Sequence, residues 1–303
     1  MTRHLPGAET AAPFTACLNP ATLSGVALPE FLALAAAGGF AAVELSIQQV
    51  LAHGPQRVRE LLNEHGLSVA AASGILPAGP VLPAPLLISD DAYVACLDGL
   101  EQRLEAFVAI GCPVATTVLN PRSDAPQTEA LATARRRIGA LCDAAAEHGL
   151  RLAVEAVSVR AGLPGELDGT NPVAATLALL GELLNETGRS NATVLVDSFH
   201  WAAAGAHRDH ITGLGDGAVG HVQIADVPDS GATREWTDAM RLFPGDGALA
   251  WPGFAEALTS IGYRGAVSVE LFNPALRALP EDEIAHRAHQ GATGCWTPVE
   301  VTR

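Results

Sequence analysis

The sequence predicts an α/β protein, a single (β/α)8 barrel, from its segment count, its recurring junctions and its length. Eight short apolar segments alternate with eight helical segments. In several places, such as EHGLSVAA and EHGLRLAV, a glycine ends a helix shortly before a buried strand begins. A length of 303 residues suits this fold. The alternative is an open doubly wound sheet, which we disfavour because no glycine-rich phosphate-binding turn follows an early strand.

The elements follow one another in a regular order along the chain. The predicted strands, rich in β-branched and aliphatic residues, cover 14–19, 40–47, 67–75, 113–120, 150–157, 193–196, 219–225 and 266–272. The predicted helices cover 29–39, 55–66, 90–111, 128–149, 173–187, a short segment beginning near His200, 252–262 and 281–294. Each strand is thus followed by a helix, which is the pattern of a parallel sheet.

Three stretches do not fit this alternation. The proline-rich residues 77–87 are expected to form a loop over the strand ends, and residues 158–172 an irregular insert. Residues 226–251 are long, polar and glycine-containing, which is typical of a mobile lid. We expect residues 1–12 to be a flexible N-terminal tail, 13–295 the single barrel domain and 296–303 a C-terminal tail.

Charge and composition exclude several classes of partner. A formal net charge of -15 argues against a nucleic-acid partner, because phosphate binding needs a basic surface. No apolar run reaches the roughly 18 residues that span a membrane, and the first residues do not resemble a signal peptide. Five scattered cysteines without a CxxC motif suit a reducing cytoplasm. We therefore expect a cytoplasmic protein, which can form homo-oligomers.

Four strands carry a lone polar residue near their carboxyl ends: Glu155, Asp197, Gln223 and Glu270. In a barrel these ends converge on one face. Three carboxylates close together repel one another unless a cation lies among them, and an all-oxygen set suits Mg²⁺ or Mn²⁺ better than zinc. The alternative is structural, with Asp197 capping the next helix and His200 covering its first turn. The joint pattern favours a divalent metal site.

Several stretches resemble the xylose-isomerase-like barrel superfamily of sugar phosphate isomerases and epimerases. They are CLNPAT (17–22), LAVEAV (152–157), VDSFHWAAAG (196–205), RLFPGDGAL (241–249) and AVSVELFNPALRALPEDEIA (266–285). Within the superfamily the chain is most similar to the inosose (2-keto-myo-inositol) isomerases. The resemblance implies metal ligands at Glu155, Asp197, Gln223 and Glu270. Gln223 departs from the inosose isomerases, which have histidine there, and resembles hydroxypyruvate isomerases and some dehydroshikimate dehydratases.

The resemblance implies a metal-dependent isomerase or epimerase acting on a keto-polyol, keto-sugar or cyclitol. The metal ion, with Mg²⁺ or Mn²⁺ favoured and Zn²⁺ or Co²⁺ as alternatives, stabilises an enediolate as a C–H proton leaves. Glu155 and Glu270 are implied to transfer the proton while also binding the metal. His200, Arg241 and Asn19 are the expected substrate-binding residues. A solvated position in the loop is the alternative for Arg241.

Other functions compete with this one. A dehydratase acting on 3-dehydroshikimate or an inosose, or a hydroxypyruvate isomerase, would use the same residues. An endonuclease on abasic DNA is disfavoured by the acidic charge and the lack of a histidine-rich cluster, and a non-catalytic binding barrel by the presence of all three acidic residues. Two further polar strand residues are interpreted as structural: Glu44 as satisfying a buried partner, and His221 as packing.

Overall fold

The computed structural model describes residues 13–77, 85–158, 167, 169–173 and 176–296. The predicted tail residues 1–12 and 297–303 lie outside the described residues, as do parts of the stretches 77–87 and 158–172. Trp296, predicted to belong to the C-terminal tail, is buried and packs edge-on against Phe14 and Trp251.

Eight parallel strands close into a barrel, which confirms the predicted fold class. In spatial order they are β1 (Thr15–Leu18), β2 (Ala42–Ser46), β3 (Ser68–Ser73), β4 (Val114–Leu119), β6 (Arg151–Ala156), β8 (Ala192–Asp197), β9 (Val219–Ile224) and β10 (Ala266–Val269). β10 pairs with β1 from Thr15↔Ala266 to Leu18↔Val269, so the sheet has no free edge. The strands β6, β8, β9 and β10 are consecutive neighbours in this order.

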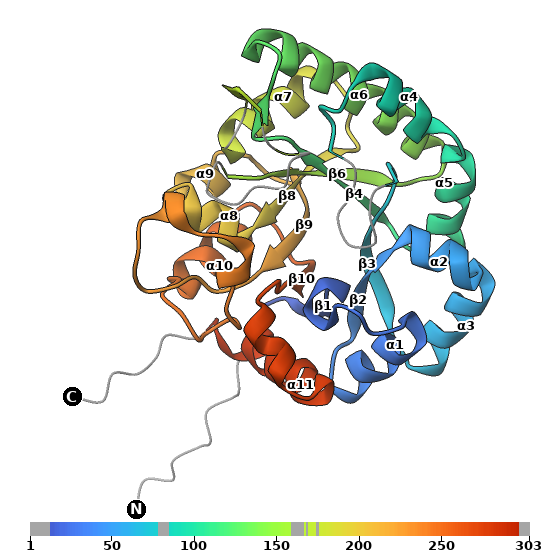
Figure 1. Cartoon of the computed structure of the whole chain (residues 1–303), viewed down its shortest axis with the longest axis vertical. Coiled ribbons are helices and arrows are strands. Elements are labelled where there is room, and N and C mark those ends of the chain that lie inside the picture. Colours follow the sequence, from blue (N-terminus) through green and yellow to red (C-terminus); the bar gives the residue numbers. More distant parts are fainter. Residues whose placement is uncertain (1–12, 78–84, 159–166, 168, 174–175, 297–303) are drawn as a thin grey trace, which may run out of the picture.

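Helices form a ring around the barrel (Figure 1). They are η1 (Pro20–Leu23), α1 (Leu28–Ala37), α2 (Ile47–His53), α3 (Pro55–Glu64), α4 (Asp90–Leu97), α5 (Leu100–Ala109), α6 (Gln127–Glu147), α7 (Leu177–Glu186), α8 (Ser198–Ala203), α9 (Asp209–Thr212), η3 (Thr233–Glu235), η4 (Asp238–Met240), α10 (Trp251–Ser260), η5 (Pro274–Ala278) and α11 (Glu281–Gly294). The last helix, α11, packs on α1 and closes the ring (Figure 1). None of the helices in the described ranges combines the length and hydropathy needed to cross a membrane.

Two local predictions are wrong. The single helix predicted over 90–111 is two helices, α4 and α5, because Gly99 between them adopts a left-handed conformation with φ of 69°. The insert expected to be irregular contributes β7 (Asn171–Pro172), which pairs antiparallel with β5 (Arg122–Ser123). Both corrections lie outside the barrel and leave the strand order unchanged.

The inside of the barrel is apolar beneath a polar rim. Ala71, Val114, Ala153 and Leu195 form a small buried apolar cluster of their own. Side chains two residues apart on a strand face the same side, so Ala153 predicts an inward Glu155 and Leu195 an inward Asp197. Glu155 and Asp197 therefore stand next to this apolar cluster.

The connection from β9 to α10 is folded around the buried carboxylate of Asp226. Its two oxygens accept hydrogen bonds from four groups: the backbone N–H of Val227 (2.8 Å), Gly245 (2.8 Å) and Leu249 (2.9 Å), and the Trp251 indole Nε1 (2.8 Å). Its backbone also pairs with Leu242 through two hydrogen bonds of 2.8 and 3.0 Å. These contacts join both ends of the 226–251 stretch and place Arg241 above the barrel. Movement of this stretch as a lid stays a prediction.

We expect Asp226→Ala to destabilise the protein by about 3 kcal/mol or more, because buried donors lose their acceptor. The stability of Asp226→Asn should lie between that of the wild type and that of Asp226→Ala, since the amide keeps one acceptor oxygen. Urea unfolding measures both variants. Asp229→Ala, at an exposed position in the same stretch, is the control and should stay within about 0.5 kcal/mol of the wild type. Equal stability of Asp226→Ala and the control would contradict this account.

Candidate active site

A cavity opens at the carboxyl end of the barrel. Its lining includes all but one of the predicted site residues, namely Asn19, Glu155, His200, Gln223, Arg241 and Glu270. Asp197, the remaining one, is buried and contacts Arg241 directly. The structure thus brings the whole predicted set together. The roles assigned to these residues remain predictions.

Asp197 uses its two oxygens for different tasks. Its Oδ1 caps α8 by accepting from the backbone N–H of Phe199 at 2.6 Å and of His200 at 3.1 Å. Its Oδ2 accepts from the Nη1 of Arg241 at 2.7 Å. Asp197 therefore caps the helix, as the structural alternative predicted, and its second oxygen faces the charged cluster.

His200 is held between a carboxylate and a hydroxyl. Its Nε2 lies 3.3 Å from Glu155 Oε1, and its Nδ1 lies 3.2 Å from the Oγ of Ser158. The ring is 5 % exposed and packs edge-on against Phe199. Contacts at both ring nitrogens fix the orientation of the imidazole, so one nitrogen stays directed at Glu155.

On the opposite side, two amides link two carboxylates. Asn19 Nδ2 donates to Glu44 Oε2 at 2.9 Å and to Glu270 Oε1 at 3.1 Å. Gln223 Nε2 donates to Glu44 Oε1 and to Glu270 Oε1, both at 3.1 Å. Glu44 is also 3.1 Å from His221 Nε2. The carboxylates are thus kept apart by shared donors rather than left to repel each other.

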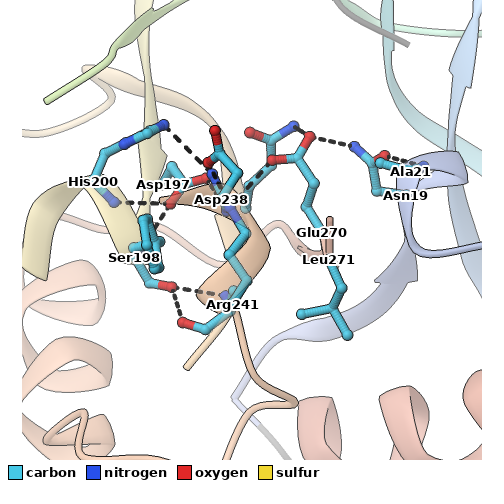
Figure 2. Close-up of polar contacts among 12 residues, drawn as sticks. Asn19, Ala21, Asp197, Ser198, His200, Asp238, Arg241, Glu270 and Leu271 are labelled. Atoms are coloured by element: carbon cyan, nitrogen blue, oxygen red, sulfur yellow. Dashed lines mark hydrogen bonds and ion pairs between the residues drawn. The ribbon is translucent and has the colours of Figure 1, made fainter. Parts of the chain in front are cut away.

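Arg241 lies between the two sides of the cluster. Figure 2 shows its guanidinium between Asp197 with His200 and Glu270 with Asn19. Nη1 is 2.7 Å from Asp197 and 3.5 Å from Glu270, and Nε donates to Asp238 at 3.1 Å. The side chain is 1 % exposed, so the alternative of a solvated loop arginine is wrong. Arg241 is buried because carboxylates surround its guanidinium, and a sequence pattern does not predict these neighbours.

Burial and neighbouring charge separate the acidities of the carboxyl groups. Burial, with the charge of nearby Asp197, raises the pKa of Glu155 to about 8. Burial also raises the pKa of Glu270 well above its usual range, although Arg241 opposes this. At Asp197 burial acts in the same direction, but Arg241 and His200 outweigh it and the pKa lies below its usual value. Two of the carboxyl groups can therefore hold a proton near neutral pH.

The donor set fits a divalent cation. The Oε1 of Gln223 is buried and has no hydrogen-bond partner among the described residues, which is costly unless a ligand meets it. Ligand atoms of Glu155, Asp197 and His200 lie within 4.8 Å of one another. Oxygen donors with excess negative charge are the environment that hard divalent ions require. Glu155, Asp197 and His200 thus form a group that could hold a metal ion, and the Gln223 oxygen lacks a partner among the described residues.

Two residues in contact with the cluster, Ser158 and Asp238, are missed by the sequence patterns, and a third, His221, is interpreted from them only as packing. Ser158 orients His200, Asp238 pairs with Arg241, and His221 pairs with Glu44 instead of only packing. The signal for His221 is its place two residues before Gln223 on one strand, which puts both on the inner face. Ser158 and Asp238 lie outside the strands, where no periodicity identifies them.

A closed parallel barrel with buried carboxylates at its carboxyl end defines a (β/α)8-barrel protein with an enzyme-like site. A family model described as a xylose isomerase-like TIM barrel matches residues 32–290. The chain belongs to the xylose isomerase-like TIM-barrel family. Proteins similar to it in sequence include a dehydratase and an isomerase, and a D-psicose 3-epimerase structure shares its fold at 18 % identity.

Individual relatives share moderate identity with the chain. A 3-dehydroshikimate dehydratase of Pseudomonas putida is 27 % identical over 266 residues, covering 86 % of this chain and 38 % of its own length. An inosose isomerase of Bacillus subtilis is 30 % identical over 148 residues, 49 % of each chain. The crystal structure of the IOLI protein with a bound zinc atom has a TM-score of 0.78 at 21 % identity, covering 93 % of this chain and 98 % of that one. The chain thus spans well under half the length of the dehydratase that it matches.

The raised pKa of Glu155 predicts a pH-dependent stability in the absence of metal. The unfolded carboxyl loses its proton near 4.5 and the folded one near 8, so the folded state binds more protons between these values. Stability should therefore fall with rising pH across this window, by up to about 1.4 kcal/mol per pH unit.

Urea unfolding in the presence of a chelator, for wild type and Glu155→Gln, measures this effect. The variant lacks the titrating group but keeps the shape of the side chain, so the difference in unfolding free energy between the two proteins should change between pH 5 and pH 8. Parallel stability curves for the two proteins over this range would show that the pKa of Glu155 is not raised.

Proposed function

We propose that the protein is a divalent-metal-dependent isomerase or epimerase of a keto-polyol or keto-sugar, such as an inosose-like hydroxyketone. The observation that carries the proposal is that Glu155, Gln223 and Glu270 line one cavity, with Asp197 joined to it through Arg241, and that the Gln223 oxygen lacks a partner among the described residues. The resemblance to inosose isomerases supports the class of substrate.

Glu155, Asp197, Gln223 and Glu270 would hold the ion. Their donor atoms are oxygens, which favours Mg²⁺ or Mn²⁺, with Zn²⁺ or Co²⁺ as alternatives because a zinc atom is bound in the IOLI structure of the same fold. When bound, the ion would supply Lewis acidity to the carbonyl and adjacent hydroxyl of the substrate.

Glu155 and Glu270 are assigned the proton transfers. One of them, ionised, takes a proton from the carbon beside the carbonyl. The other, protonated, returns a proton to the neighbouring carbon for isomerisation or to the opposite face for epimerisation. Their place on the lining of the same cavity supports these roles, because an acid–base group must lie within reach of the substrate.

The remaining residues are assigned to substrate binding. The Nε2 of His200 faces the cavity beside Glu155 and can hydrogen-bond a substrate oxygen. Arg241 brings fixed positive charge to the mouth of the site from the 226–251 stretch, which we propose closes over the substrate. Asn19 holds Glu270 in place and lines the same cavity, where it can contact substrate.

A dehydratase is the second candidate. Its support is Gln223, together with the 27 % identity to a 3-dehydroshikimate dehydratase across most of the chain. Dehydration begins with the same proton removal and then expels a β-hydroxyl group, so the same residues would serve. We also propose a reducing, cytoplasmic location, which is supported by five free cysteines, three of them buried.

A screen of the Mn²⁺-loaded protein against inososes, ketohexoses, hydroxypyruvate and 3-dehydroshikimate, with product analysis, tests the proposal. We expect turnover of a neutral hydroxyketone to its isomer or epimer, and the loss of both turnover and metal in Asp197→Ala. Elemental analysis measures the metal. Equal metal content in wild type and Asp197→Ala would refute the metal site, and release of water from the substrate would identify the dehydratase.

Glu155→Gln and Glu270→Gln should each lower turnover on the order of 10²- to 10⁴-fold, even at saturating metal. An amide keeps an oxygen for the metal but accepts no proton at neutral pH. Glu105→Gln, at an exposed position on α5, is the matched control and should keep wild-type turnover. If adding metal restored near-wild-type turnover to both site variants, they would be ligands without a role in proton transfer.

A further inference from the structure

The side-chain amides of Asn19 and Gln223 both link Glu44 and Glu270, but they differ in the hydrogen bonding of their oxygen atoms. Both hydrogens of the Asn19 amide point to the two carboxylates, and its Oδ1 accepts from the backbone N–H of Ala21 at 2.8 Å. Both hydrogens of the Gln223 amide point to the same carboxylates. Its Oε1 is equally buried but has no partner within the described chain. The same arrangement therefore leaves one oxygen satisfied by the protein and one open to a ligand.

Glu44 is itself an unsuitable metal ligand. Its carboxylate accepts from Asn19 at 2.9 Å, lies 3.1 Å from His221 Nε2, and receives Gln223 Nε2 at 3.1 Å on one oxygen and 3.3 Å on the other. Three donor groups of the protein thus converge on this carboxylate, with three contacts on Oε2 and one on Oε1. Its charge is thus committed to donors of the protein, and its side chain is 2 % exposed.

From this geometry we infer that Glu44 is a positioning residue that sets the orientation of the Gln223 amide. The ionised carboxylate of Glu44 only accepts hydrogen bonds, so the Gln223 nitrogen must face Glu44 and the oxygen must face away from it. A flipped amide would place oxygen against this carboxylate and lose the hydrogen bonds to it. Resting on the proposed function, the inference is that Glu44 keeps Gln223 Oε1 directed at the metal without touching the metal. Residues of this kind typically change metal affinity 10- to 100-fold.

A double-mutant cycle tests this inference with Mn²⁺ affinity from calorimetry as the readout. Glu44→Gln introduces a donor that allows the Gln223 amide to rotate, so we expect a 10- to 100-fold loss of affinity. In a Gln223→Glu background both ligand atoms at this position are oxygens and orientation no longer matters. There Glu44→Gln should cost less than about threefold, or should raise affinity by removing a like charge.

His221→Gln is the matched control, because it changes the same buried contact to Glu44 but keeps both carboxylates that accept from Gln223. It should leave affinity within about threefold of wild type. Equal losses for Glu44→Gln in both backgrounds, a loss in His221→Gln as large as in Glu44→Gln, or no loss in Glu44→Gln would overturn the inference.

Side-chain amide resonances in ¹⁵N spectra give a second readout without metal. The Gln223 signal is identified by its absence in Gln223→Glu. We expect both of its protons to exchange slowly in wild type and at least one to exchange faster and shift in Glu44→Gln. An unchanged signal in Glu44→Gln would overturn the inference. If the wild type bound no divalent ion, the proposed function would fail, and the amide signal alone would decide whether Glu44 orients Gln223.

Discussion

The arrangement of the site depends on balancing negative charge that the barrel buries. Glu155, Asp197 and Glu270 lie close together with little exposure to solvent, and uncompensated carboxylates are costly there. The negative charge is balanced in part by the Arg241 guanidinium, which lies between Asp197 and Glu270. Protons retained on Glu155 and Glu270, whose pKa values are raised, reduce it further. A divalent cation would supply the missing charge directly. The pKa shifts and the buried Arg241 are therefore consequences of one constraint.

That balance depends on a connection outside the barrel. Arg241 belongs to the stretch between β9 and α10. The carboxylate of Asp226 stabilises this stretch by accepting hydrogen bonds from donors at both of its ends. The charge that compensates Asp197 is thus supplied by a loop and not by a strand. Any displacement of the loop changes the electrostatics of the cluster beneath it, because Arg241 moves with its backbone.

In the proposed function, the chemistry of the cluster begins with removal of a proton beside a carbonyl group. Isomerisation, epimerisation and dehydration share this step and differ in where the second proton or the hydroxyl group goes. Relatives with names from each of these reactions share the barrel of this chain. A neutral amide at Gln223, oriented by its neighbours, keeps the donor set all-oxygen where an imidazole would bring nitrogen. The substrate, more than the carboxylates, selects among these outcomes.

The sequence by itself determined the barrel, because the spacing of apolar residues and the glycines that end helices depend on local structure. It also placed Glu155, Asp197, Gln223 and Glu270 on neighbouring strands. It did not determine the break at Gly99, which requires a backbone conformation that glycine permits but does not demand. Only the tertiary structure paired residue 44 with 223 and residue 197 with 241, and buried Arg241. These partners are far apart along the chain, and they meet because the sheet closes and a loop folds over its end. Contacts of this kind follow from three-dimensional packing and charge balance, which no local pattern of residues encodes.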